Sequence, residues 1–241
     1  MEFNSPERAE TVRVAVVGNA GDDDDGFVGE RLRDLGATFS RYERDDPDTL
    51  KTADQDVELL VLLGSDWSVY DEKYQRSVES ERSLVLRAQQ RNLPILGICF
   101  GGQLISSALG LVVAPTSLPE IGWRQLQTHD ERLIASGPWF QFHFDRWTDG
   151  AGITSIAHTE SGPQGYWYGK TLALQFHPEV TLPTVERWCV EGKESLLVAG
   201  EDLDRVMADT AREIERARQR CHQLVDQFLA HAQNAKYPEA R

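Results

Sequence analysis

Cys99 stands in a sequence context that is typical of a nucleophile. The stretch Gly97-Ile98-Cys99-Phe100-Gly101 follows an apolar run and opens a segment with helical spacing. It is the cysteine form of G-x-S-x-G, a sharp turn between strand and helix that lifts the side chain off the sheet. The helix N-terminus favours a thiolate there, and the backbone amide of Phe100 is placed to donate to an oxyanion. A buried core cysteine beside a tight turn is the alternative, because short motifs also match by chance.

A base for this thiol is available in His177, with Glu179 as its partner. A strand predicted over residues 172–176 runs into His177-Pro178-Glu179, where the proline stops the ladder. Because residues two apart in extended chain face the same side, His177 and Glu179 can project together. Glu179 can then accept from one ring nitrogen while the other takes the thiol proton. Taken alone, such a stretch is more often a loop histidine beside an unrelated glutamate; the turn at Cys99 is what favours the catalytic interpretation.

Strand and helix patterns alternate through the first half of the chain, which predicts a parallel sheet with crossover helices. In such folds the sites lie at the carboxyl ends of the strands, where both Cys99 and His177 stand. Buried strands are predicted over residues 12–17, 57–63 and 93–96, and helices over residues 27–35, 79–91 and 104–109. Three further strand patterns span residues 122–128, 153–157 and 172–176.

We expect one domain with an addition at each end. Residues 1–10 are predicted to be a flexible, solvated arm, residues 11–190 the domain, and residues 191–241 a helical extension. After Pro183 helix formers dominate, with helices expected over 184–198 and 202–233. The last helix has a sparse apolar stripe that predicts packing on the domain or on a partner, formed by Val206, Ile214, Leu224, Val225 and Phe228.

Composition excludes several classes of protein. The 25 Lys and Arg against 39 Asp and Glu give a formal charge of −14, which argues against binding to nucleic acid or an anionic membrane. No apolar stretch approaches the roughly 20 residues that span a bilayer, and the charged N-terminus lacks a signal core. Three cysteines without paired spacing fit a reducing compartment, so a cytoplasmic protein is expected.

No cofactor or metal is predicted from the remaining motifs. The turn at residues 18–21 lacks the G-x-G-x-x-G fingerprint of dinucleotide sites. The acidic run at residues 22–25 is expected to be solvated, because four consecutive carboxylates do not converge on one ion without special turns. The other histidines show no metal-ligand spacing; they are His129, His143, His158, His222 and His231.

Two stretches resemble the class I glutamine amidotransferases, which use a Cys-His-Glu triad. Residues 94–103 read Pro-Ile-Leu-Gly-Ile-Cys-Phe-Gly-Gly-Gln, and residues 173–180 read Ala-Leu-Gln-Phe-His-Pro-Glu-Val. The resemblance runs from about residue 12 to residue 188 and is strongest toward the glutaminase domain of GMP synthetase and its free-standing relatives. Further likeness lies at residues 64–71, 120–123 and 143–145.

The resemblance implies an α/β fold, a mostly parallel open sheet flanked by helices (flavodoxin-like), here followed by a C-terminal helical tail. It implies that Cys99 attacks the glutamine carboxamide, His177 shuttles the proton and Glu179 orients the histidine. Backbone amides at Ser65 and Phe100 would form the oxyanion hole, and no metal, flavin or nucleotide is required. The implied substrate contacts, of which Gln103 and Asp145 would hold the amino-acid end, are Gly64, Gln103, His143, Phe144 and Asp145.

The chain departs from the family at residues 65–66, where Ser-Asp replaces Gly-Pro. A backbone donor tolerates such a change, but Ser65 would cost conformational freedom if the family glycine needs a positive φ. The substitution therefore bears on the geometry of the oxyanion hole and on ligand selectivity.

The leading functional hypothesis is hydrolysis of the γ-amide of glutamine through a glutamyl thioester, with ammonia passed to a separate synthetase. The alternative is a free-standing γ-glutamyl hydrolase, which cleaves γ-glutamyl amides or peptides with a bulky leaving amine and needs no ammonia acceptor. Tryptophans near the expected mouth favour a wider apolar pocket unless they are core anchors: Trp67, Trp123, Trp139, Trp147 and Trp167. A catalytically idle binding module is the third reading, and the intact triad argues against it.

Overall fold

The apolar runs of the sequence form the centre of an eight-stranded sheet in the computed structural model, which describes residues 11–150, 153 and 155–237. The arm expected at residues 1–10 lies outside the described residues. Five neighbouring strands are parallel, in the order β2 (Thr38–Glu43), β1 (Arg13–Gly18), β3 (Leu59–Leu62), β4 (Ile95–Ile98) and β10 (Thr171–Leu174). Every residue of β3, β4 and β10 is buried, as expected for parallel strands covered on both faces.

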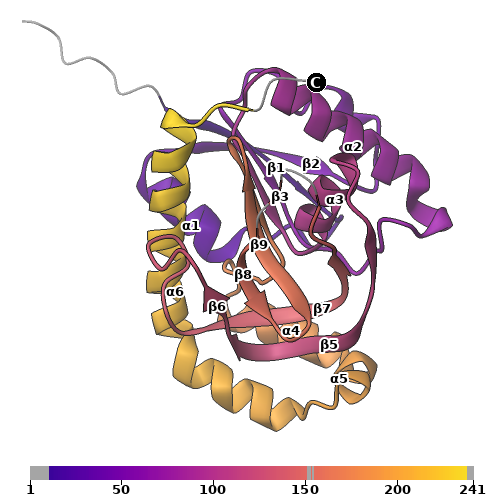
Figure 1. Cartoon of the computed structure of the whole chain (residues 1–241), viewed down its shortest axis with the longest axis vertical. Coiled ribbons are helices and arrows are strands. Elements are labelled where there is room, and N and C mark those ends of the chain that lie inside the picture. Colours follow the sequence, from indigo (N-terminus) through magenta and orange to yellow (C-terminus); the bar gives the residue numbers. More distant parts are fainter. Residues whose placement is uncertain (1–10, 151–152, 154, 238–241) are drawn as a thin grey trace, which may run out of the picture.

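Antiparallel strands continue this sheet beyond β10. They are β9 (Gly162–Tyr168), β8 (Ser155–Thr159) and β6 (Gln127–Thr128). A separate two-stranded antiparallel sheet is formed by β5 (Val113–Gln125) and β7 (Pro138–Trp147), seen low in Figure 1. The expected mostly parallel open sheet is therefore confirmed. The sequence patterns did not predict β2 and β9 of this sheet, or β7 of the small sheet.

Helices cover both faces of the large sheet. Val14 and Val16 of β1 pack on the side of α1 (Gly26–Asp34) and α6 (Leu203–Asn234). Ala15 and Val17 face the side of α2 (Gln75–Gln90) and α3 (Phe100–Ala108), so alternate residues of one strand serve two cores. Figure 1 shows α1 and α6 on one side of the strands, with α2 and α3 on the other.

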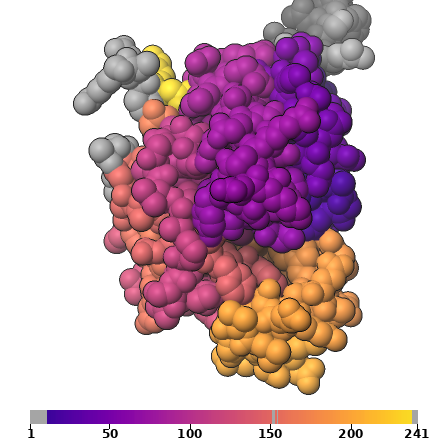
Figure 2. All heavy atoms as spheres, turned by 90° about the vertical axis from the view of Figure 1, so that its right-hand side faces the viewer, coloured from indigo at the N-terminus to yellow at the C-terminus, as the bar shows by residue number. Residues whose placement is uncertain are grey.

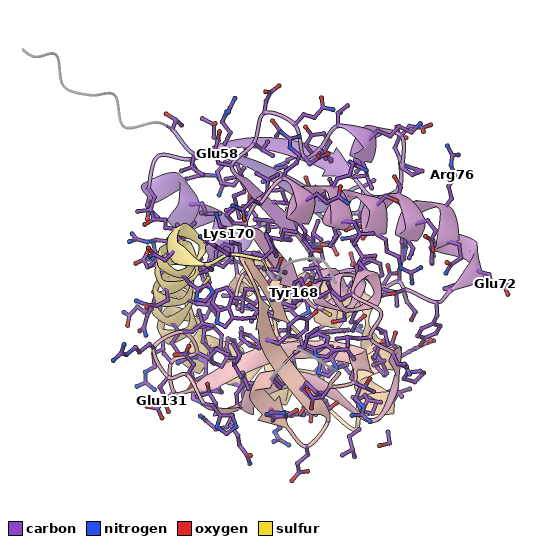
Figure 3. All side chains as sticks on the ribbon, turned by 45° about the horizontal axis from the view of Figure 1, so that its top comes forward. Glu58, Glu72, Arg76, Glu131, Tyr168 and Lys170 are labelled. Atoms are coloured by element: carbon purple, nitrogen blue, oxygen red, sulfur yellow. The ribbon has the colours of Figure 1, made fainter. Side chains whose placement is uncertain are left out.

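The outer face of α2 is charged and its inner face carries one buried acid. Glu72 of the short 3₁₀ helix η2 (Glu72–Tyr74) and Arg76 at the start of α2 point away from the molecule in Figure 3. Glu81, further along the same helix, is fully buried. A second 3₁₀ helix, η1 (Thr49–Lys51), precedes β3.

The C-terminal region adds two short helices and one long one. The helix expected over 184–198 is two helices, α4 (Leu182–Glu191) and α5 (Lys193–Ala199), separated at Gly192. The long helix α6 packs on the domain, and its predicted apolar stripe is buried. Arg31 of α1 donates two hydrogen bonds to Asp226 of α6, at 2.8 and 2.9 Å. No helix in the described ranges combines the length and apolar character needed to cross a bilayer.

Candidate active site

Cys99 occupies a sharp turn between β4 and α3. Its φ of 50° and ψ of −109° place it in a backbone conformation that L residues rarely adopt. The turn is fixed by its amide, which donates to the carbonyl of Leu174 on β10 at 2.8 Å. A Cβ on Gly101 would lie 2.2 Å from the carbonyl oxygen of Leu62, so the helix can approach β3 only through a glycine. The strand–turn–helix expected from the sequence is present.

His177 and Glu179 lie beside this turn and are hydrogen-bonded to each other. The Nδ1 of His177 is 2.7 Å from Oε1 of Glu179, and both side chains are buried, as is Cys99. The His177 amide donates to the carbonyl of Phe140 on β7 at 2.8 Å, which ties the loop after β10 to the small sheet. A Cβ on Gly64 would lie 2.9 Å from Cε1 of His177 and 3.6 Å from Cβ of Cys99. The three predicted residues are therefore brought together around Gly64.

The electrostatic surroundings keep His177 protonated. Burial alone lowers the pKa of His177, because it disfavours the charged ring. Electrostatic interactions with Glu179 and Cys99, together with hydrogen bonds to both side chains, outweigh burial and raise the pKa of His177 from 6.5 to about 10. At neutral pH the imidazolium is therefore the prevailing form, ready to give a proton to a leaving group.

Gln175 is a neighbour of the sulfur that the sequence analysis did not single out. Its Nε2 donates to Sγ of Cys99 at 3.7 Å, while its Oε1 accepts from Nε2 of Gln103 at 3.3 Å. The alternation of side chains in extended chain could have predicted it, because Gln175 is two residues before His177 and therefore faces the same side as His177 and Glu179.

A cavity of about 710 Å³ opens in front of Cys99 and His177. Its wall comes from the ends of β1 and β3, from β7, and from α4 and α5. In Figure 2 the orange α4–α5 segment meets the purple N-terminal half of the chain along a seam. All predicted substrate contacts line this cavity, namely Gly64, Gln103, His143, Phe144 and Asp145.

The side chains predicted to hold substrate are themselves fixed by partners. The carboxylate of Asp145 accepts from Ser68 Oγ and Tyr70 Oη, each at 2.7 Å. Nε2 of Gln103 donates to the backbone carbonyl of Asp145 at 3.3 Å. Nε2 of His143 lies 3.2 Å from Oε2 of Glu120. Buried and multiply hydrogen-bonded, this wall is a preformed surface.

Ser65 adopts its position without the strain that a required positive φ would impose. In the described ranges the non-glycine residues with positive φ are Asp56, Asn92 and Cys99. Ser65 is not among them, and its hydroxyl accepts from the amide of Trp67 at 3.1 Å. The serine is thus compatible with a backbone donor at this strand end.

Most of the tryptophans expected at the mouth are elsewhere. Trp67 lines the cavity, as does Trp188, which was not predicted and whose ring lies 4.9 Å from that of His177. Trp139 and Trp147 of β7 are buried core residues, which is the core-anchor alternative of the sequence analysis. Trp123 donates to Thr210 of α6, and Trp167 stacks on His231 of α6 at 3.9 Å in a separate recess.

The expectation that the acidic run at residues 22–25 is solvated is wrong for Asp25, which is buried, and the carboxylates of the run diverge toward different partners. Asp22 accepts from Arg187 at 2.6 Å, Asp24 from Thr184, and Asp25 from Arg33 and Arg41. A different group, Glu30, Asp34 and His222, brings possible metal ligands within 4.8 Å of one another between α1 and α6. Arg218 already pairs with Glu30 there, at 2.5 Å, which leaves a cation little to gain.

Comparison with known proteins gives consistent matches. The sequence model of the family described as glutamine amidotransferase class-I matches residues 27–189. The GMP synthase (glutamine-hydrolyzing) of Aeropyrum pernix is 28% identical over 162 residues, which are 64% of this chain and 30% of that protein. This chain thus corresponds to less than a third of that relative's length.

Solved structures extend the likeness over nearly the whole chain. A glutamine amidotransferase from Thermotoga maritima is 25% identical, with a TM-score of 0.79, covering 91% of this chain and 99% of that one. A glutamine amidotransferase from Methylobacillus flagellatus shares the fold, with a TM-score of 0.81 at 19% identity, covering 96% and 98%.

Proposed function

This chain belongs to the class-I glutamine amidotransferases, and on that premise we propose that it hydrolyses the γ-carboxamide of glutamine to glutamate and ammonia. The observation that carries the proposal is that Cys99 and His177 both line the cavity, while Glu179 is hydrogen-bonded to the imidazole of His177. A thiol, a histidine and an orienting carboxylate are the groups that covalent acyl transfer needs.

In the first half-reaction the sulfur of Cys99 attacks the carbonyl carbon of the glutamine side-chain amide (Cδ), forming a C–S bond and a tetrahedral oxyanion. The amides of Ser65 and Phe100 donate to that oxygen; Phe100 heads α3, where backbone N–H groups lack partners within the helix. The imidazolium of His177 gives its proton to the amide nitrogen, the C–N bond breaks, and ammonia leaves behind a glutamyl thioester.

In the second half-reaction water replaces ammonia. Neutral His177, held by Glu179, takes a proton from water, which attacks the thioester carbon. The C–S bond breaks, glutamate leaves, and the sulfur and the imidazolium return to their starting states. Asp145 binds the α-ammonium of the glutamyl group and Gln103 its amino-acid end, a role supported by their place in the cavity wall.

We place the ammonia acceptor on a separate synthetase. The basis is the A. pernix relative, a GMP synthase of which this chain matches 30%. The acceptor is part of the proposal, since free ammonia would otherwise be lost to solvent.

A second candidate, hydrolysis of γ-glutamyl amides with larger leaving amines, is favoured by the size of the cavity. Its 710 Å³ extends past Cys99 to Asp22, Arg187 and Ser195, and the rings of Trp67 and Trp188 border it. Pockets for drug-sized ligands have comparable volumes, whereas glutamine alone is a smaller molecule.

The test is glutamate release from glutamine and from a panel of γ-glutamyl amides, with ammonia measured in the glutamine reaction. We expect equal amounts of glutamate and ammonia from glutamine, and none from the Cys99→Ala variant. Release only from the amides would select the second candidate. Release that survives Cys99→Ala would refute both.

A further inference from the structure

Arg44 is a fully buried arginine directly behind the candidate site. It follows β2, and its amide continues the ladder by donating to the carbonyl of Gly18 at 2.8 Å. Its guanidinium forms an ion pair with Glu81 of α2, with Nε to Oε2 at 2.7 Å and Nη2 to Oε1 at 3.1 Å. A charge in such a place is costly unless every polar atom is matched.

The remaining donors of Arg44 bind the ends of two other strands. Nη2 donates to the carbonyl of Leu63 at 3.0 Å and Nη1 to that of Gly64 at 3.0 Å. Nη1 also donates to Oδ1 of Asn19 at 2.7 Å. With the two bonds to Glu81 this makes five hydrogen bonds, the number of N–H groups on a guanidinium.

The same guanidinium also contacts the turn that carries the nucleophile. Its Cζ lies 4.5 Å from the centre of the Phe100 ring. Phe100 follows Cys99, and Gly64 precedes Ser65. One side chain therefore binds the carbonyl of the Gly64–Ser65 peptide unit, whose N–H is the Ser65 amide, and contacts the ring of Phe100.

We propose that Arg44, held by Glu81, is a positioning residue that sets the distance between the Ser65 and Phe100 amides. The inference rests on the proposed function, because it gives those amides a role in stabilising an oxyanion. A donor that is shifted by a fraction of an ångström loses much of its effect on charge that develops in the transition state. If the ion pair between Arg44 and Glu81 had only a structural role, replacing Arg44 would lower the free energy of unfolding and leave kcat unchanged.

Arg44→Lys is the most informative variant. Lysine keeps the charge beside Glu81 but has three donors, so at least two of the five acceptors lose their partner. The matched control is Arg87→Lys. Arg87 belongs to α2 and also pairs with a buried acid, donating to Asp54 and to the carbonyl of Leu50 at 2.9 Å, but it does not line the cavity.

Steady-state kinetics on the best substrate of the panel, below the melting temperature of each variant, then tests the role. We expect Arg44→Lys to lower kcat about 10- to 100-fold with KM within twofold of the parent, and Arg87→Lys to leave both within twofold. The labelling rate of Cys99 by iodoacetamide, which needs no oxyanion hole, should change less than kcat. Loss of kcat in proportion to that labelling rate, or an unchanged kcat, would overturn the role of Arg44.

Guanidinium rescue provides a second measurement in case lysine disturbs the fold. In Arg44→Ala, added guanidinium chloride should restore kcat at least fivefold more than ammonium chloride of equal ionic strength, and no such gain is expected in Arg87→Ala. Equal effects of the two salts would count against the proposal. If the unmutated protein hydrolyses no substrate of the panel, the proposed function itself is overturned. If the unmutated protein is active and Arg44→Lys leaves kcat unchanged, only this inference is overturned.

Discussion

The backbone amide of Phe27 donates to the carbonyl of Glu179 at 2.8 Å, which fastens the first turn of α1 to the loop that holds the histidine and its carboxylate. Gly26 makes this approach possible. Its φ is +42°, and a Cβ there would lie 1.9 Å from that same carbonyl oxygen. The site is thus supported by an element that contributes no side chain to its chemistry.

Replacing Gly26 should therefore damage both stability and activity. We expect Gly26→Ala to lower the free energy of unfolding by about 2 kcal/mol or more, since it adds a backbone clash to a positive φ. Gly36→Ala is the control, because Gly36 also has a positive φ (+86°) but nothing lies within 4 Å of its Cβ position. Urea unfolding and kcat report the two effects; equal losses in both variants would show that the contact with Glu179 is unimportant.

The three cysteines should differ sharply in reactivity. Burial raises the pKa of Cys189 to about 11 and that of Cys221 well above its usual value, so both remain thiols. Cys99 alone adjoins a protonated histidine, and mass spectrometry after brief iodoacetamide treatment should find it labelled first. Cys99→Ala should abolish glutamate release, whereas Cys189→Ala should retain it. Retained activity in Cys99→Ala would end its assignment as nucleophile.

The proton on His177 should persist to high pH. Its raised pKa means that the imidazolium is present throughout the neutral range and is lost as the pH rises through about 10. The contribution of protonated His177 to the free energy of unfolding is complete below pH 6.5 and is lost as the pH rises through about 10. Nitrogen-15 spectra of labelled histidine should show both ring nitrogens protonated at pH 8. In Cys99→Ala the pKa of His177 should fall. A pKa of His177 near 6.5 in the unmutated protein would contradict its stabilisation by Glu179 and Cys99.

Loss of the base should cost more than loss of its orienting partner. His177→Ala removes both proton transfers, whereas Glu179→Ala chiefly loosens the ring, whose Nδ1 it holds at 2.7 Å. We expect kcat to fall further in His177→Ala than in Glu179→Ala. A larger fall of kcat in Glu179→Ala than in His177→Ala would contradict the roles of base and orienting partner.

The charge of the cavity wall should select among leaving amines. Five carboxylates line the described wall, accompanied by Arg187: Asp22, Asp45, Asp66, Asp145 and Glu191. Among γ-glutamyl amides of ethylenediamine, ethanolamine and glycine, which are similar in size, kcat/KM should fall in that order, by about threefold per step at low salt. Added salt should reduce the differences in kcat/KM among the three amides. A preference for the glycine derivative would place the leaving group elsewhere.

Gln103→Ala should raise KM for every γ-glutamyl substrate alike, because the glutamyl part is common to all. The side chain is within the cavity wall and linked to Asp145 and Gln175. Trp67→Ala should instead change the preference among amines, and Trp167→Ala, whose ring stacks on α6, serves as its control. An unchanged KM in Gln103→Ala for glutamine and for bulkier amides would mean that the glutamyl pocket lies elsewhere.

The sequence was most informative where chemistry and local structure coincide. The turn at Cys99 and the pair His177 and Glu179 depend on neighbours within a few residues, so motif and alternation were enough to predict their geometry. Strand β2 was missed because it is the edge of the sheet, where only Phe39 and Tyr42 are half-buried and no apolar run results.

Contacts between distant segments could not be predicted in this way. Arg44 and Glu81 are 37 residues apart, and charged residues are expected at the surface unless a partner is known. Trp188 reaches the cavity only because α4 folds back over β7, an arrangement to which no local pattern points. Trp139 and Trp147 show the converse: they lie on the same strand as the cavity residues His143 and Asp145 but are buried in the core, so proximity in sequence could not separate pocket rings from core anchors.

The long helix α6 has a bearing on how the protein is made. It supplies Leu224, Val225 and Phe228 to the core that also contains β1, and it is synthesised after every strand of the sheet. At ribosomal speeds of about 5 to 20 residues per second, the part of that face that α1 does not cover stays exposed for seconds after Cys99 and His177 have left the tunnel. During this interval the nascent chain exposes apolar surface that a chaperone can bind, and its reactive sulfur lies in an unfinished fold. Completion of α6 is thus the step that buries this apolar surface and encloses the segment around Cys99.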